Sequence, residues 1–272
     1  MSATTEQAAA PTPATKASRS QAASAGRTVL GLLVVPAVLL VIWAIVAAAL
    51  DSLVFPGPVQ AVEDLLNDLQ RPAYRDSVLT SVRLLAVSWA LAAIVGAVVG
   101  FVLGQSQFWS KVFQTPLFAL YSIPKVTLYP IFLLLLGLGE PSRIVFAFLH
   151  GVFPVALLVM GATATLDKKL VRLADALELS WWQRTTKVVL PALLPTVLVA
   201  LRISFGLTFL GLVLAEMFSA DIGLGRELVN NVANVRVGQI AGQVLFIGLL
   251  ALGPVLALLA VERRVKARVG IK

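Results

Sequence analysis

The chain has 272 residues and a net charge of +8, and 58% of its residues are apolar whereas only 13% are charged. A soluble domain of this length cannot bury so much apolar side chain behind so few charges, so we expect lipid to surround most of it. The sequence has no cysteine, one histidine and no HExxH, CxxC or P-loop pattern, which excludes disulfides and argues against a zinc site or nucleotide binding by this chain. Basic residues in a membrane protein usually mark its cytoplasmic side, so the charge is not interpreted as nucleic-acid binding.

Six apolar stretches follow a polar tail. Residues 1–27 are rich in Ala, Ser, Thr and Pro and predict a disordered tail. Each stretch provides the roughly 20 residues that a helix needs to cross about 30 Å of hydrocarbon, and the first is too long for a secretory signal. The sequence predicts an all-α integral membrane protein with six transmembrane helices in a domain of residues 28–262, followed by a basic tail at 263–272. The expected spans are 29–50, 84–104, within 112–138, within 144–166, 190–215 and 237–261.

Lys and Arg are distributed unevenly between the loops that these spans create. Six spans put both termini on one side, and the segments on that side contain most of the basic residues. Both termini are therefore predicted to be cytoplasmic. The outer segments, 51–83 and 216–236, would form an external cap for a soluble partner, with Glu216 and Asp221 as candidate contacts; alternatively, Glu216 only ends its helix.

The cytoplasmic stretch 167–190 is unusually polar for this chain. Leu170, Ala174, Leu177 and Trp181 recur at helical spacing, which predicts an amphipathic helix. Two roles remain open from the residues alone. The helix would either rest on lipid headgroups or project as a handle that a soluble cytoplasmic protein holds.

Residues 180–195 read SWWQRTTKVVLPALLP, which is similar to the end of the cytoplasmic EAA loop of ABC-importer permeases. The segments SIPKVTLYPIFLLLLGLGEPSRIV at 122–145 and LRISFGLTFLGLVLAEMFSADIGLGREL at 201–228 resemble the nitrate/sulfonate/taurine branch of that family. The resemblance covers residues 50–262 and implies the type I ABC importer permease fold. When the loop is aligned on Leu190 and Pro191, the family glutamate falls on Arg172 and the family glycine on Glu178.

The resemblance also implies partners. It implies a non-catalytic permease subunit of the bacterial cytoplasmic (inner) membrane that forms a homodimer or pairs with a paralogous permease. Two ABC ATPase subunits, which bind ATP and Mg, would grip the 167–190 loop, and an extracytoplasmic substrate-binding protein would dock outside. The implied ATPase-coupling residues are Arg172, Ala174, Leu177, Glu178, Ser180, Trp181, Trp182, Gln183 and Pro191.

Several unusual residues lie within the predicted spans. Pro124, Lys125 and Pro130 interrupt the third span, where they would line a cavity or, alternatively, form a kink from which the lysine reaches the inner face. Arg202 could reach the cytoplasmic interface or pair with a carboxylate or carbonyl, in a structural or gating role. His150 is interpreted as a hydrogen-bonded packing residue. Two basic residues in the bundle suggest an anionic solute such as a sulfonate, taurine or nitrate.

Two other function classes fit the sequence less well. A secondary transporter or channel would work without an ATPase, but such proteins place carboxylates within the membrane, and the predicted spans contain essentially none. An intramembrane enzyme would need converging acids, metal ligands or an activated serine, and none is recognisable. The sequence therefore favours an importer permease.

Overall fold

The computed structural model describes residues 34, 36–50 and 55–269, in two units that divide after Gln60. The first unit contains an apolar helix, Pro36–Leu50, in which the Trp43 indole donates a 3.0 Å hydrogen bond to the carbonyl of Pro56. The predicted tail, 1–27, and the start of the first predicted span, residues 29–33, lie outside the described residues.

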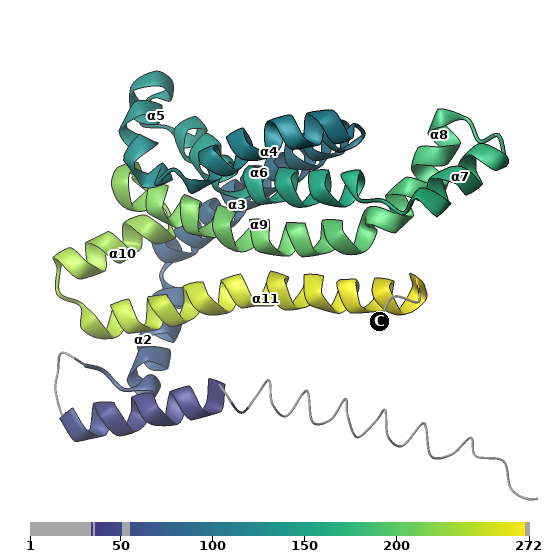
Figure 1. Cartoon of the computed structure of the whole chain (residues 1–272). Helices are drawn as coiled ribbons and strands as arrows, with labels where there is room; N and C mark the ends of the chain where they lie inside the picture. Colours follow the sequence, from purple (N-terminus) through teal and green to yellow (C-terminus); the bar gives the residue numbers. More distant parts are fainter. Residues whose placement is uncertain (1–33, 35, 51–54, 270–272) are drawn as a thin grey trace, which may run out of the picture. The chain divides into compact units, whose positions relative to one another are not determined.

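The second unit is a bundle of helices, and α2 begins just before it (Figure 1). Its described residues contain no strand. The α-helices are α2 (Pro58–Gln70), α3 (Pro72–Gly104), α4 (Gln107–Ser122), α5 (Tyr129–Leu136), α6 (Glu140–Ala164), α7 (Lys168–Ala176), α8 (Trp181–Arg184), α9 (Leu190–Ser219), α10 (Leu224–Ala233) and α11 (Val237–Val269). A 3₁₀ turn, Lys125–Leu128, precedes α5, and a π-helical turn, Thr185–Val189, joins α8 to α9.

Four helices in the described part of the chain are long and apolar enough to cross a membrane, and α4 with residues 125–136 adds a pair bent by 79°. These elements match the second to sixth predicted spans. The predicted start of the second span was wrong, because α3 begins at Pro72 rather than Leu84. The polar first turns of α3 contact two other helices: Ser77 donates a hydrogen bond to Glu227 of α10, and Arg83 forms an ion pair with Glu140 at the start of α6. The basic tail predicted from residue 263 likewise begins inside α11.

One side of α3 is made of small residues that let α6 approach closely. A Cβ atom added at Gly100 would lie 2.5 Å from the carbonyl oxygen of Ala156, so only glycine fits at this contact. Close backbone approach of this kind is how helices associate in lipid, where burial of apolar surface gives little drive. The buried small residues of α3 are Ser77, Ser81, Ser88, Ala92, Gly96, Gly100 and Gly104.

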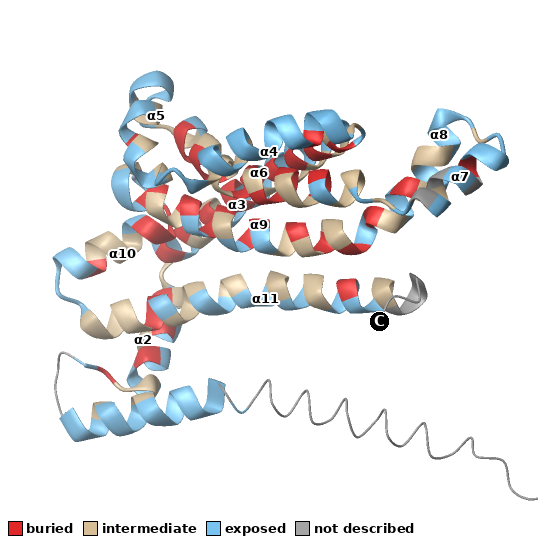
Figure 2. Cartoon of the chain, in the orientation of Figure 1, coloured by how far each residue is buried: buried red, intermediate tan, exposed pale blue. Residues whose placement is uncertain are grey.

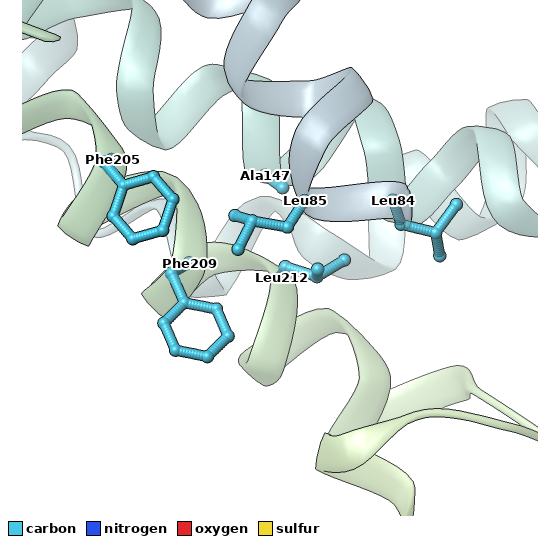
Figure 3. Packing of buried hydrophobic residues seen from close by; sticks show 6 residues of the cluster. All are labelled: Leu84, Leu85, Ala147, Phe205, Phe209 and Leu212. Carbon is cyan, nitrogen blue, oxygen red and sulfur yellow. The ribbon is translucent and has the colours of Figure 1, made fainter. Parts of the chain in front are cut away.

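The apolar core lies where α3, α6 and α9 meet. Figure 3 shows six of its side chains, Leu84, Leu85, Ala147, Phe205, Phe209 and Leu212. Trp89 connects α3 to α9. Its ring lies edge-on to that of Phe205, with 5.5 Å between the ring centroids, and its N–H donates a hydrogen bond to the carbonyl of Leu201. In contrast, α11 packs against α9 along one side only and leaves much of its apolar surface exposed (Figure 2). Such a surface suits lipid or a second membrane helix.

Candidate functional site: the coupling segment and the outer turn

The stretch 167–190, which the sequence predicts to be cytoplasmic, is not the single amphipathic helix that the spacing predicted. It forms two short helices, α7 and α8, separated by a turn, and Figure 1 shows both at one end of the bundle, opposite α10. The predicted apolar face is divided, since Ala174 is 1% exposed whereas Leu177 is 61% and Trp181 55% exposed. The helical period failed because the turn interrupts it after Ala176. These exposed apolar side chains suit contact with a soluble protein and also insertion among headgroups, so burial alone does not distinguish the two roles.

The turn between α7 and α8 explains the family glycine. The N–H of Leu179 donates to the carbonyl of Ala174 at 3.1 Å, and the N–H of Glu178 donates to the carbonyl of Asp175 at 3.0 Å. This pair of bonds is a Schellman motif, whose left-handed residue is usually glycine. Glu178 occupies that position with a φ of 51°. The sequence placed the family glycine on this residue, and the backbone still turns here despite the side chain.

Replacing Glu178 with glycine is therefore expected to stabilise the turn. A left-handed backbone costs a residue with a Cβ about 1–2 kcal/mol, and glycine escapes that cost. Hydrogen exchange of the amides at 177–180 should slow by about tenfold in Glu178→Gly. Glu178→Ala is the control, because it removes the charge but keeps the Cβ. Equal protection in both variants would show that charge, not backbone conformation, limits the turn.

A capping box starts α8. The Ser180 hydroxyl accepts a hydrogen bond from the Gln183 N–H at 3.4 Å, and the Gln183 side chain accepts one from the Ser180 N–H at 3.1 Å. Such a reciprocal pair fixes a helix start. Arg184 on α8 also pairs with Asp175 on α7 at 3.1 Å. Together these contacts hold Trp181 and Trp182 on a defined surface, where their rings meet edge-on at 5.0 Å.

The π-helical turn makes α8 continuous with α9. The N–H of Leu190 donates to the carbonyl of Thr185, five residues earlier, where a regular α-helix would use a spacing of four. Pro191 has no N–H, and in a regular helix its ring would clash with the carbonyl of Lys187; the wider turn accommodates it. A single helical rod thus runs from Trp181 to Ser219. Sequence reasoning missed this continuity, because a proline such as Pro191 normally marks the end of one helix or the first turn of the next.

The turn between α9 and α10, residues 220–223, is predicted to face the outside and is called the outer turn here; a buried carboxylate organises it. Glu216 is 0% exposed, and it accepts hydrogen bonds from the Ser81 hydroxyl at 2.7 Å and the Gly225 N–H at 2.9 Å. Direct contact between Glu216 and an external protein is therefore contradicted, whereas Asp221 is exposed on the same turn. Gly223 adopts a φ of 143°, which favours glycine, and a Cβ there would meet the carboxylate at 2.6 Å.

The break in the third span lies at Pro124, as predicted, but Pro130 does not contribute to it. Pro130 lies in the first turn of α5, where a backbone N–H would have no acceptor within the helix, so a proline does not break it. Lys125 donates a 2.7 Å hydrogen bond to the carbonyl of Tyr121 and lies over the rings of Tyr121 and Phe153 at 4.9 and 5.4 Å. Among the described residues no carboxylate pairs with Lys125. Its ammonium is thus stabilised by a carbonyl and aromatic faces and not by a counter-ion.

Arg202 lies beside a carboxylate, one of the alternatives that the sequence left open, but the sequence did not identify the partner. Its guanidinium lies 3.5 Å from Glu262 on α11, and Glu262 also binds Lys266 at 2.8 Å. Glu262 comes directly after the last predicted span, 237–261, and nothing in the local sequence pattern indicates a contact with a residue 60 positions earlier. The pair connects the α8–α9 rod to α11, so it supports a structural role for Arg202.

His150 behaves as the sequence predicted. Its Nδ1 lies 2.9 Å from the carbonyl oxygen of Phe146, and the centroids of the His150 and Phe146 rings are 4.6 Å apart. The opposing helix provides a glycine here, since a Cβ at Gly211 would approach the imidazole at 2.7 Å. The side chain is therefore packed between α6 and α9.

Comparison with known proteins identifies the family. The family described as "Binding-protein-dependent transport system inner membrane component" matches residues 92–271. The chain belongs to this family. It is 31% identical to SsuC of Bacillus subtilis (strain 168), a permease protein named for aliphatic sulfonates transport, over 73% of this chain and 72% of that protein. The nitrate import permease protein NrtB of Synechocystis is 27% identical, over 79% and 82% of the two chains.

A third relative is the taurine transport system permease protein TauC of Escherichia coli (strain K12), 28% identical over 84% of this chain and 86% of that one. A crystal structure of a bacterial alginate ABC transporter matches with a TM-score of 0.60 and 17% identity, covering 92% of this chain and 96% of the other, and so supports the fold. The chain is thus an ABC importer permease of the nitrate/sulfonate/taurine branch, as its motifs predicted. Membership of this family sets aside the secondary-transporter alternative.

Proposed function

We propose that this permease imports a small solute with a delocalised oxyanion group, a sulfonate, taurine or nitrate, by coupling to ATPase subunits through the α7–α8 segment. The observation that carries the coupling is the exposed apolar surface of Leu177, Trp181 and Trp182, because the two tryptophans begin the continuous helix Trp181–Ser219 that spans the bundle. When two ATPases close on ATP and Mg, force applied to α8 would move α9 as one body. This chain contributes no catalytic residue; hydrolysis belongs to the ATPase.

The substrate class rests on the relatives and on the basic residues of the bundle. The three relatives are named for aliphatic sulfonates, nitrate and taurine, whose polar groups share negative oxygens. Lys125, at the break beside Pro124, has no carboxylate partner among the described residues and is our candidate for attracting such a group in the translocation pathway. Arg202 would gate that pathway indirectly through its contact with Glu262.

The assembly proposed is a dimer of permeases in the bacterial inner membrane with both termini in the cytoplasm. One set of six spans forms half of a pathway, and a two-fold pair would complete it. A substrate-binding protein would dock on the outer turn near Asp221, since the alginate transporter structure contains a periplasmic protein and most of that chain aligns with this one. The domain limits proposed are a tail at 1–27, a permease domain at 28–262 with its coupling loop at 167–190, and basic residues at 263–272.

The coupling assignment is tested by placing a charge on the exposed apolar surface. Leu177→Glu and Trp181→Glu should each reduce the ATPase that copurifies with the tagged permease by at least about tenfold, as expected for central apolar contacts. Arg263→Glu, an exposed change at the cytoplasmic end of α11, is the matched control and should retain the ATPase. Monodisperse elution of the variants would show that they remain folded. An unchanged complex in both glutamate variants would refute the assignment.

A further inference from the structure

A cavity of about 510 Å³ lies between α4 and α6 near the end of the bundle that carries the α7–α8 segment. One of its walls is polar and comes from a single face of α4, where Gln107, Ser110, Lys111 and Gln114 recur at helical spacing. The other wall is apolar and includes Leu158 of α6. A polar wall opposite an apolar one indicates an amphipathic ligand.

The polar wall is suited to an oxyanion. Lys111 supplies an ammonium group that no carboxylate pairs with among the described residues. Gln107 and Gln114 supply amide N–H donors from the turns on either side. Ser110 lines the same wall although it is only 9% exposed, and it adds a hydroxyl group to the polar side chains there. Ammonium, amide and hydroxyl donors together form the usual environment of a phosphate group.

Aromatic residues place this wall at the membrane interface. Phe108 and Trp109 are 65% and 49% exposed, and their rings contact edge-on at 5.2 Å. Phe113 continues the row, with its ring 5.8 Å from that of Trp109. Exposed tryptophan beside basic and amide side chains is typical of the headgroup region of a bilayer. The cavity therefore lies at the depth where lipid phosphates lie.

An apolar groove continues from the cavity. A second cavity of about 700 Å³ shares Leu157, Leu158, Gly161 and Thr165 with the first and extends to Leu170 of α7 and Leu193 of α9. Its lining is mostly apolar and also includes Asp167 and Thr196. A soluble oxyanion would leave this groove empty, whereas an acyl chain would fill it. The groove therefore favours a lipid as the source of the phosphate.

We propose that this cavity binds the headgroup of an anionic phospholipid from the cytoplasmic leaflet, with the phosphate on Lys111 and an acyl chain over Leu158 and Gly161. The choice of leaflet rests on the orientation proposed above. The bound lipid would touch α7 through Leu170, so it would form part of the base from which the α7–α8 segment projects. Basic pockets between transmembrane helices on the cytoplasmic side bind anionic headgroups in this way.

Native mass spectrometry of the delipidated full-length protein tests the proposal without any transport reaction. Phosphatidylglycerol titrated into the protein should give a one-lipid adduct that phosphatidylcholine gives far less readily. Lys111→Gln should weaken the adduct by about fivefold, the effect of one basic residue near an anionic surface. Lys169→Gln is the matched control, since it removes an exposed charge on the same side and Lys169 does not line the cavity. Equal retention by both lysine variants would overturn the proposal.

A second variant distinguishes a lipid from a soluble ion. Nothing lies within 4 Å of a Cβ at Gly161, so Gly161→Leu should fold normally while it fills the apolar wall. It should lose the phosphatidylglycerol adduct with Lys111 intact. If the adduct persists in Gly161→Leu, the acyl chain does not lie over Gly161 and the proposed site is wrong. If millimolar inorganic phosphate displaces the adduct from the unaltered protein, the site takes a free oxyanion and the lipid assignment is wrong. These outcomes do not depend on ATPase binding, so they are separable from failure of the proposed function.

Discussion

Glu216→Ala is expected to destabilise the permease by about 3–5 kcal/mol, because it removes the acceptor around which the outer turn is built. The Ser81 hydroxyl and the Gly225 N–H would both lose their partner in a site with no access to water. Each buried donor left without a partner costs about 1–3 kcal/mol. Arg143 is 7% exposed and donates to the carbonyl of Ile222 in the same turn. The substitution would also remove the Glu216 carboxylate, whose negative charge interacts with the Arg143 guanidinium.

The measurement is the temperature at which the detergent-purified protein loses its monodisperse elution peak. Asp221→Asn is the matched control, since it neutralises an exposed carboxylate on the same turn and should leave that temperature unchanged. Glu216→Gln should be intermediate, because the amide oxygen can accept one of the two hydrogen bonds while its NH₂ group opposes the other donor. Equal behaviour of Glu216→Ala and Asp221→Asn would show that the buried hydrogen bonds do not stabilise the turn.

The spans could be predicted because their cause is local. A helix in lipid needs only enough consecutive apolar residues, and the second to sixth stretches of this sequence supply them. Polar residues at helix ends gave the errors. Ser77 and Arg83 suggested a loop, whereas in the fold they contact Glu227 and Glu140 from other helices and remain helical. Contacts over such separations leave no periodic signal in the sequence.

For the segment 167–190, the sequence predicted the position and the family but not the turn between α7 and α8. Its position and its family were recognisable from SWWQRTTKVVLPALLP, and the alignment placed the family glycine on Glu178. The side-chain pattern alone indicated one helix, because helical spacing continues across the turn by chance. The turn depends on the backbone conformation of a single glutamate, and most sequences with glutamate here would be helical.

Two connections across the bundle give the mechanism its physical basis. The helix from Trp181 to Ser219 connects α8 to the outer turn, where Glu216 contacts α3 and the start of α10, so under the proposed coupling a displacement of α8 would reach that turn. The Arg202–Glu262 pair connects the same rod to α11. A rod held at both places would shift as one element against its neighbours, as expected of the rigid-body changes that switch access in transporters.

Gly100→Ala is expected to destabilise the bundle, whereas Gly248→Ala is expected to stabilise it slightly. At Gly100 the added Cβ would meet the Ala156 carbonyl oxygen at 2.5 Å and the Met160 nitrogen at 3.0 Å, and backbone atoms cannot rotate away. Helices α3 and α6 would have to separate, at a cost of about 1–3 kcal/mol. At Gly248 nothing lies within 4 Å of the new Cβ, so only the gain of about 0.4–1 kcal/mol from a less flexible unfolded chain remains.

The opposite signs make this pair a test of how α3 and α6 are held together. Both glycines lie inside transmembrane helices, so helix propensity alone would predict that both alanine variants are more stable. Thermal loss of the elution peak should occur at a lower temperature for Gly100→Ala and at an equal or higher one for Gly248→Ala. If Gly100→Ala matched Gly248→Ala, the two backbones would not be in contact at Ala156. Close approach of α6 would then not be the reason that α3 carries small residues on this side.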